Sequence, residues 1–133
     1  MNAPQTVTLW TPERANKALP LVRRIADDVI RTYGQWRALV AKFEIASIGT
    51  TAAPGSEADR LQREVQRAAE DIEGFMQELA ELGVDCKSLE NGLFDFPCER
   101  EGRIVLLCWM YGERAVTHWH EVDAGFAGRA PLE

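Results

Sequence analysis

The sequence lacks the features that would assign the protein to a membrane or to a secretory pathway. None of its apolar runs approaches the roughly 20 residues that a membrane-spanning helix needs. Its first residues have neither the basic start nor the apolar stretch of a signal peptide. It has only three cysteines, an odd number, which favours reduced thiols in a chain without export signals. We therefore expect a soluble protein of the cytoplasm.

Positive charge is also scarce. The 133 residues include 15 lysines and arginines against 21 aspartates and glutamates, which gives a formal net charge of −6. This balance argues against nucleic acid as the main partner, because binding to phosphates requires a basic face. The hydrophobic fraction of 46% and the charged fraction of 27% are those of an ordinary globular protein. At this length we expect one domain, residues 1–133, with a single core.

The first two thirds of the chain predict a pair of helices. Thr11 and Pro12 start the first helix, because a threonine hydroxyl can cap a helix and proline suits its first turn. Pro20 interrupts the pattern, so we expect either a short helix that ends near Ala18 or a kinked one. From there to about Ser47 the apolar residues keep helical spacing.

The second helix carries the most regular apolar pattern in the chain. It follows a loop at residues 48–55, with Ser56 as its cap and Gly83 as the residue that ends it. We expect its heptad seam to pack against the first helix, in an antiparallel hairpin over residues 11–82. Packing against a second copy of the chain is the alternative. The seam consists of Leu61, Val65, Ala68, Ile72, Phe75, Leu79 and Leu82.

After Gly83 the apolar period changes to two, which predicts β-strands. We expect an antiparallel β-meander of three to four strands over residues 84–121, laid on the helical hairpin in an α+β fold. A further short strand or extended lead-in is expected at residues 7–10. The strands of the meander are predicted at residues 84–87, 93–97, 103–110 and 115–121.

The strand at residues 103–110 is apolar at every position from 104 to 109, so both faces of the sheet must be covered there. The helices can cover one face only. The other face requires the tail at residues 122–133, the N-terminal segment or a second copy of the chain. For this reason we expect a homodimer.

A register for the sheet follows if turns at residues 99–102 and 110–113 close its hairpins. Phe96 then lies opposite Val105, and Leu107 lies opposite Val116. The same register keeps Cys98 and Cys108 apart, which argues against a disulfide. A slip of one residue would exchange the faces. The first face holds Phe94, Phe96, Val105, Leu107, Trp109 and Val116, with His118 and His120 at its end; the second holds Leu93, Asp95, Ile104, Leu106, Cys108, Met110, Thr117 and Trp119.

Motifs are concentrated in the last third of the chain. They read Gly-Leu-Phe-Asp-Phe-Pro at 92–97, Gly-Arg-x-Val-x-Leu-Cys-Trp at 102–109 and Trp-His-x-x-x-Ala-Gly-Phe-Ala-Gly-Arg at 119–129. With the Leu-Trp-Thr-Pro-Glu-Arg-Ala-Asn opening at 9–16, they resemble the uncharacterised bacterial family catalogued as domain of unknown function 2203. The resemblance spans nearly the whole chain but implies no activity, because that family has none established. The matching residues are Asp95, Trp109, Glu113, Trp119, His120, Gly125, Phe126, Gly128 and Arg129.

Two histidines form the simplest candidate metal site. His118 and His120 are two residues apart on a predicted strand, so their imidazoles share one face, and this spacing suits a divalent transition metal. Glu113, Glu121 or Asp123 could supply a carboxylate ligand. The alternative is a pair of solvent-exposed histidines at the edge of the sheet. His118 does not belong to the family motif, which weakens this site.

Asp95 lies between two phenylalanines in an apolar strand, where a carboxylate is costly unless it is paired. Arg129 or the indole N–H of a tryptophan is the expected partner. Such a pair would pin the tail to the sheet, or it would hold a carboxylate for acid–base chemistry together with His120 and Glu113. Cys108 is expected to be a buried core thiol.

A ligand pocket is the last candidate. Its expected walls are Trp109, Trp119 and Phe126, with Arg129 as the group that binds an anion beside the glycines at 125 and 128. The alternative is that these aromatics belong to the core, with Phe126 covering the open face of the sheet while the glycines let the tail turn against it. No nucleophile–base pair with a known mechanism is present. Three classes of function remain: a self-associating binding protein, which we favour; a small enzyme that uses His120, Asp95, Glu113 and Arg129; and a metal-binding protein centred on His118 and His120.

Overall fold

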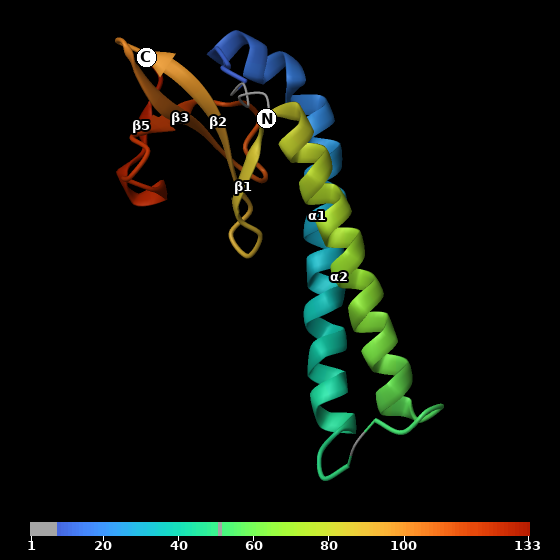
Figure 1. Ribbon diagram of the computed structural model, residues 1–133. Coiled ribbons are helices and arrows are strands. Elements are labelled where there is room, and N and C mark those ends of the chain that lie inside the picture. Colours follow the sequence, from blue (N-terminus) through green and yellow to red (C-terminus); the bar gives the residue numbers. More distant parts are fainter. Residues whose placement is uncertain (1–7, 51) are drawn as a thin grey trace, which may run out of the picture.

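A computed structural model describes residues 8–50 and 52–133. Two long helices form a hairpin, and one end of it packs against a small antiparallel sheet (Figure 1). This confirms the predicted α+β class, with five strands instead of three to four. The elements are α1 (Pro12–Ala46), α2 (Glu57–Leu82), β1 (Asp85–Ser88), β2 (Leu93–Arg100), β3 (Arg103–Met110), β4 (His118–His120), a 3-10 turn (Phe126–Gly128) and β5 (Ala130–Pro131), and the strands lie in the order β1-β2-β3-β4-β5.

The first helix begins as predicted but does not end near Ala18. The Thr11 hydroxyl accepts the backbone N–H of Arg14, and Pro12 occupies the first turn. Pro20 lies inside one continuous helix of 35 residues. The proline removes one backbone hydrogen bond from the helix. Leu19 and the neighbouring apolar residues before and after the proline are buried against the sheet, and this burial holds the helix together.

The second helix has both predicted caps. The Ser56 hydroxyl accepts the N–H of Asp59, and Gly83 has a left-handed φ of 89°. Its heptad seam faces α1, with Leu61, Ala68 and Leu79 fully buried. Neither helix in the described part of the chain combines the length and the apolar character that crossing a bilayer requires.

The hydrophobic core lies between α1 and one face of the sheet. The sheet contributes Phe94, Phe96, Cys98, Val105, Leu107 and Trp109, and the helices contribute residues such as Val22, Val29 and Leu79. Of the segment predicted as a strand at residues 7–10, Val7 lies outside the described residues. Trp10 forms an isolated parallel bridge with Cys98, and its indole N–H donates to the carbonyl of Gly83.

The first hairpin differs from its predicted register by two residues. Arg100 lies opposite Arg103 and Phe96 opposite Leu107. The turn is tighter than expected, because Glu101 and Gly102 both adopt positive φ (53° and 78°) and close a two-residue loop. An even shift keeps every side chain on its predicted face.

The register of the second hairpin differs from the predicted one by an odd number of residues, so the side chains of β4 lie on the opposite faces from those predicted. Leu107 lies opposite Trp119, not Val116, and Cys108 lies opposite His118. The connection is longer than the four-residue turn we assumed. Glu113 folds it, since its carboxylate accepts the N–H of Met110. As a result, His118 and His120 share a face with Asp95 and Cys108, and Trp119 turns toward the core side.

Asn16 fixes α1 to the segment that precedes β4. Its side-chain amide donates to the carbonyl of Val116, and its side-chain oxygen accepts the N–H of Val116 at 2.7 Å. The side chain thus takes the place of a missing strand partner.

We predict that Asn16→Ala lowers the free energy of unfolding by about 2 kcal/mol, because it leaves the backbone groups of Val116 unpaired. Lys17→Ala, on the exposed neighbouring residue, should change it by less than about 0.5 kcal/mol. Chemical denaturation of the two variants checks this. Equal stabilities would show that Asn16 does not hold the helix to the sheet.

Candidate functional site

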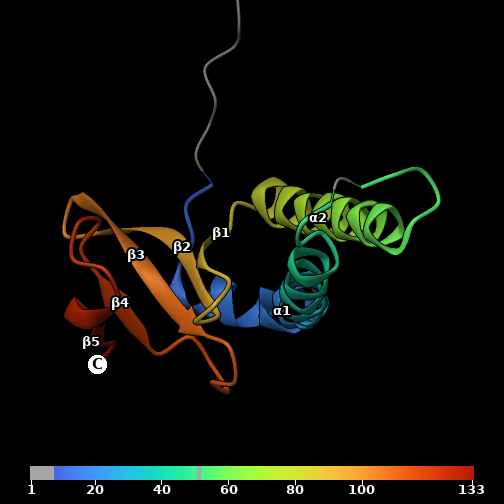
Figure 2. The ribbon, with the colours of Figure 1, turned by 90° about the horizontal axis from the view of Figure 1, so that it is seen from below.

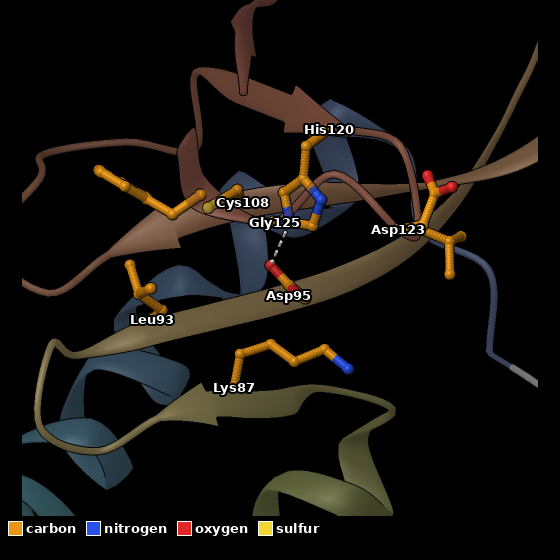
Figure 3. Close-up of a pocket in the computed structure, with 9 residues that line it drawn as sticks. Lys87, Leu93, Asp95, Cys108, His120, Asp123 and Gly125 are labelled. Atoms are coloured by element: carbon orange, nitrogen blue, oxygen red, sulfur yellow. Dashed lines mark hydrogen bonds and ion pairs between the residues drawn. The ribbon is translucent and has the colours of Figure 1, made fainter. Parts of the chain in front are cut away.

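Three polar side chains meet on the face of the sheet that points away from the helices (Figure 3). Asp95 on β2 lies directly opposite Cys108 on β3, and His120 comes from β4 beside them. All three are buried, with exposed fractions of 1%, 1% and 4%. A carboxylate oxygen, the thiol sulfur and a ring nitrogen all lie within 4.8 Å of one another. We call these residues the Asp95–Cys108–His120 cluster.

The hydrogen bonds of His120 fix its tautomer. Its Nδ1 lies 2.7 Å from the backbone carbonyl of Glu121. A carbonyl oxygen can only accept, so Nδ1 carries a proton and donates it. Nε2 therefore faces Asp95, whose Oδ1 is 3.1 Å away. The ring nitrogen that points into the cluster is the one whose lone pair is free to share a proton or bind an ion.

Asp95 is incompletely satisfied. Its Oδ1 contacts His120, but its Oδ2 is buried and has no hydrogen-bond partner within residues 8–50 and 52–133. Burial raises the pKa of this carboxyl group above its ordinary value, against the opposing effect of His120. Leaving a buried acceptor unpaired costs about 1–3 kcal/mol. The free oxygen is therefore a position at which an ion, a ligand or an ordered water can bind.

Cys108 is a protonated thiol in this setting. Burial raises its pKa, and the charge of Asp95 raises it further. Arg129 acts in the opposite direction, with its Nη1 at 4.0 Å from the sulfur. A further positive charge in the cluster would be needed to make Cys108 a thiolate at neutral pH.

Glu113 holds Arg129 in place beside the sulfur. The guanidinium donates two hydrogen bonds to this carboxylate, at 3.1 and 2.7 Å. Arg129 lowers the pKa of Glu113 below its ordinary value. The Arg129 guanidinium also lies over the ring of Phe126, 4.5 Å from its centroid. A hydrogen-bonded pair, Asp95–His120, and an ion pair, Glu113–Arg129, therefore flank Cys108.

A pocket of about 290 Å³ opens beside the cluster. Its inner wall is formed by Asp95, Cys108 and His120. Its outer wall comes from the segment after β4, which crosses the second face of the sheet (Figure 3). Lys87 stands at the rim, paired with Asp85 at 2.8 Å. The remaining lining residues are Leu93, Val122, Asp123, Gly125 and Phe126.

The structure brings together the predicted residues Asp95, Glu113, His120 and Arg129, but it pairs them differently. We expected Arg129 or a tryptophan as the partner of Asp95, and this prediction is wrong. The partner is His120, because the register of β4 turns that side chain to the second face. Arg129 pairs with Glu113 instead.

The predicted aromatic wall is divided between two faces. Trp109 is fully buried in the core, where its indole N–H donates to the carbonyl of Glu113. Trp119 packs against the same core, with the guanidinium of Arg100 4.7 Å from its ring centroid. Of the three predicted aromatics, Phe126 lines the pocket.

The predicted metal ligands are likewise separated. His120 belongs to the cluster and Asp123 lines the pocket, but His118 stands outside, with its Nδ1 2.9 Å from the hydroxyl of Thr117. Cys108 is buried, as predicted, but sequence reasoning did not place it beside His120. Part of the signal was present, because the alternation of β2 and β3 already placed Asp95 and Cys108 on one face.

Glu113→Gln should lower the Tm of the protein, and the size of this loss should depend on pH. A carboxylate with a lowered folded-state pKa stabilises the protein above its unfolded pKa, and this contribution is lost as the pH falls through the folded value. We expect the difference in Tm between wild type and Glu113→Gln to be largest at pH 7 and to shrink below about pH 4.5. Thermal unfolding at pH 7 and below about pH 4.5 checks this. The same difference in Tm under both conditions would contradict the account of the Glu113–Arg129 pair.

Comparison with curated proteins and with solved structures finds no match for this chain. A family model described as an uncharacterized conserved protein (DUF2203) matches residues 8–132, which include the cluster, its flanking ion pair and the helical hairpin. The chain therefore belongs to the DUF2203 family of uncharacterized conserved proteins.

Proposed function

We propose that this protein binds a divalent transition metal ion, with zinc as the best fit, through Asp95, Cys108 and His120. The observation that supports this most directly is the buried, unpartnered Oδ2 of Asp95 inside a set of three ligand groups that lie within 4.8 Å of one another. Carboxylate, thiolate and imidazole are the three ligand types that zinc uses in proteins. The thiol disfavours magnesium and calcium, which prefer oxygen ligands.

Metal binding would remove the energetic penalty of the unpartnered carboxylate oxygen. The Oδ2 of Asp95 would coordinate the ion. The charge of the ion would also lower the pKa of the Cys108 thiol, so that this residue would bind as a thiolate.

The surrounding residues suit the same role. Metal-binding histidines commonly donate their second ring N–H to a carbonyl, as Nδ1 of His120 does to Glu121. Arg129 points an N–H at the sulfur of Cys108, which would stabilise the thiolate, and Glu113 orients Arg129. These contacts would hold the ligands in place before the ion binds.

Three protein ligands leave one position of a tetrahedral ion free. The pocket of about 290 Å³ lies beside the cluster, so this position would be open to water or to a small molecule. We therefore propose a metal-dependent binding protein, in which an exogenous ligand completes the coordination. Both carboxylate oxygens of Glu113 already accept hydrogen bonds, so Glu113 is better suited to positioning Arg129 than to acting as a catalytic base.

Measuring the metal content of variants distinguishes the Asp95–Cys108–His120 cluster from the His118–His120 site predicted from the sequence. We expect protein purified without chelators to carry or take up one equivalent of zinc, measured by elemental analysis and native mass spectrometry. Replacement of one of only three ligands in Cys108→Ser or His120→Asn should weaken binding by at least about 100-fold. Cobalt substitution should give a thiolate-to-metal charge-transfer band that Cys108→Ser abolishes.

His118→Asn and Cys86→Ser are the matched controls, because each removes the same chemical group from a position outside the cluster. Both should bind zinc as wild type does. Loss of binding in His118→Asn with retention in Cys108→Ser would contradict the proposal in favour of the His118–His120 site. No uptake by wild type at micromolar zinc would refute both.

A further inference from the structure

The segment between β4 and β5, residues 121–129, forms the outer wall of the pocket beside the cluster. Figures 1 and 2 show it on the side of the sheet farthest from the two helices. Both ends of this segment contact the cluster. The Glu121 carbonyl accepts the ring N–H of His120, and Arg129 points an N–H at the sulfur of Cys108. We call residues 121–129 the strap, and its position depends on two of the side chains that would bind the ion.

The strap presents apolar side chains to the pocket and leaves them partly open to solvent. Val122 is 61% exposed and Phe126 is 42% exposed, although both line the pocket. Leu93 of β2, which is half-buried, adds a third apolar side chain to the lining. A bound molecule with an apolar group would therefore gain affinity by removing this surface from water.

The proposed ion would leave the cluster without net charge. Asp95 and a Cys108 thiolate carry two negative charges, which balance the two positive charges of zinc, and His120 binds as a neutral ring. An anion at the open position would therefore meet no excess positive charge from the ion and its protein ligands.

The charged residues of the pocket wall outside the cluster add a net negative charge. They are Lys87 and Asp123. The ammonium group of Lys87 is paired with Asp85 at 2.8 Å, so its charge is already balanced. Asp123 makes no ion pair with residues 8–50 or 52–133, so its carboxylate is not balanced by a cation of the described chain. A carboxylate or phosphate ligand would be repelled by this charge.

We propose that the open position of the ion takes an uncharged molecule with a nitrogen donor and a small apolar group, such as a substituted imidazole. This inference rests on the proposed metal site. Of the ligand types that zinc prefers, thiolate and carboxylate bring a negative charge, whereas an imidazole nitrogen does not. The apolar group would lie against Leu93, Val122 and Phe126. The pocket volume of about 290 Å³ is at the lower limit for ligand pockets, which restricts the ligand to a small molecule.

Titration of the cobalt-loaded full chain with imidazole and with 4-phenylimidazole tests the apolar wall. A donor that binds the ion changes its visible absorption, and at about pH 8 imidazoles are uncharged. We expect 4-phenylimidazole to bind at least about 10-fold more tightly than imidazole, because its phenyl ring covers apolar surface. Val122→Ser and Phe126→Ala, each first saturated with cobalt, should reduce this ratio by at least about 3-fold.

Phe43→Ala is the matched control, because it removes the same side chain from a position on α1 outside the pocket. It should keep the full ratio of the two affinities. A ratio that falls equally in Phe43→Ala and Phe126→Ala would overturn the assignment of the strap as the apolar wall.

Benzoate tests the charge argument, because it joins a phenyl ring to a carboxylate donor. It should bind at least about 10-fold more weakly than 4-phenylimidazole, and Asp123→Asn should strengthen its binding by about 3-fold without changing that of 4-phenylimidazole. No uptake of cobalt by wild type would refute the proposed metal site and this inference with it. Uptake of cobalt with equal affinities for the two imidazoles, or with benzoate as the tighter ligand, would overturn this inference alone.

Discussion

The hydrogen bond between Asp95 and His120 is the interaction on which the second face of the sheet depends. It joins β2 to β4 across Cys108, and both of its side chains are buried. Without it, Asp95 would be an isolated carboxylate in an apolar strand, which is among the most costly arrangements in a protein interior. Even with it, one carboxylate oxygen has no partner in the described part of the chain. The sheet thus keeps a polar cluster that is only partly satisfied by the described residues, and this observation supports the proposed metal site.

The geometry of two turns decides which side chains reach that cluster. The two-residue turn at Glu101–Gly102 sets Cys108 opposite Asp95. The longer connection folded by Glu113 then sets β4 so that His120 faces them. The same glutamate holds Arg129, so one residue shapes the connection and positions the cation beside the sulfur. A single-residue change in either register would move a member of the cluster into the core.

The sequence predicted the parts of the fold that depend on local rules. Caps at Thr11, Ser56 and Gly83, the heptad seam and the alternating strands follow from short-range chemistry, and the structure has them all. It did not predict the partner of Asp95 or the face of His120. Both depend on the register of β4, which is set by the length and hydrogen bonds of a loop without a turn signature. Of the two alternatives at Pro20, the helix that ends near Ala18 is wrong, because burial against the sheet outweighs the local penalty of the proline.

The most direct test of the central claim is the stability of Asp95→Asn with and without zinc. The folded-state pKa of Asp95 is raised, so its ionisation costs stability as the pH rises through that value. An uncharged amide can donate to Nε2 of His120, and in chelator at pH 7 we expect Asp95→Asn to be at least as stable as wild type. With zinc, wild type should become the more stable, while Asp123→Asn, which alters an exposed pocket carboxylate, should respond as wild type does. Equal destabilisation of Asp95→Asn under both conditions would instead make Asp95–His120 a purely structural pair.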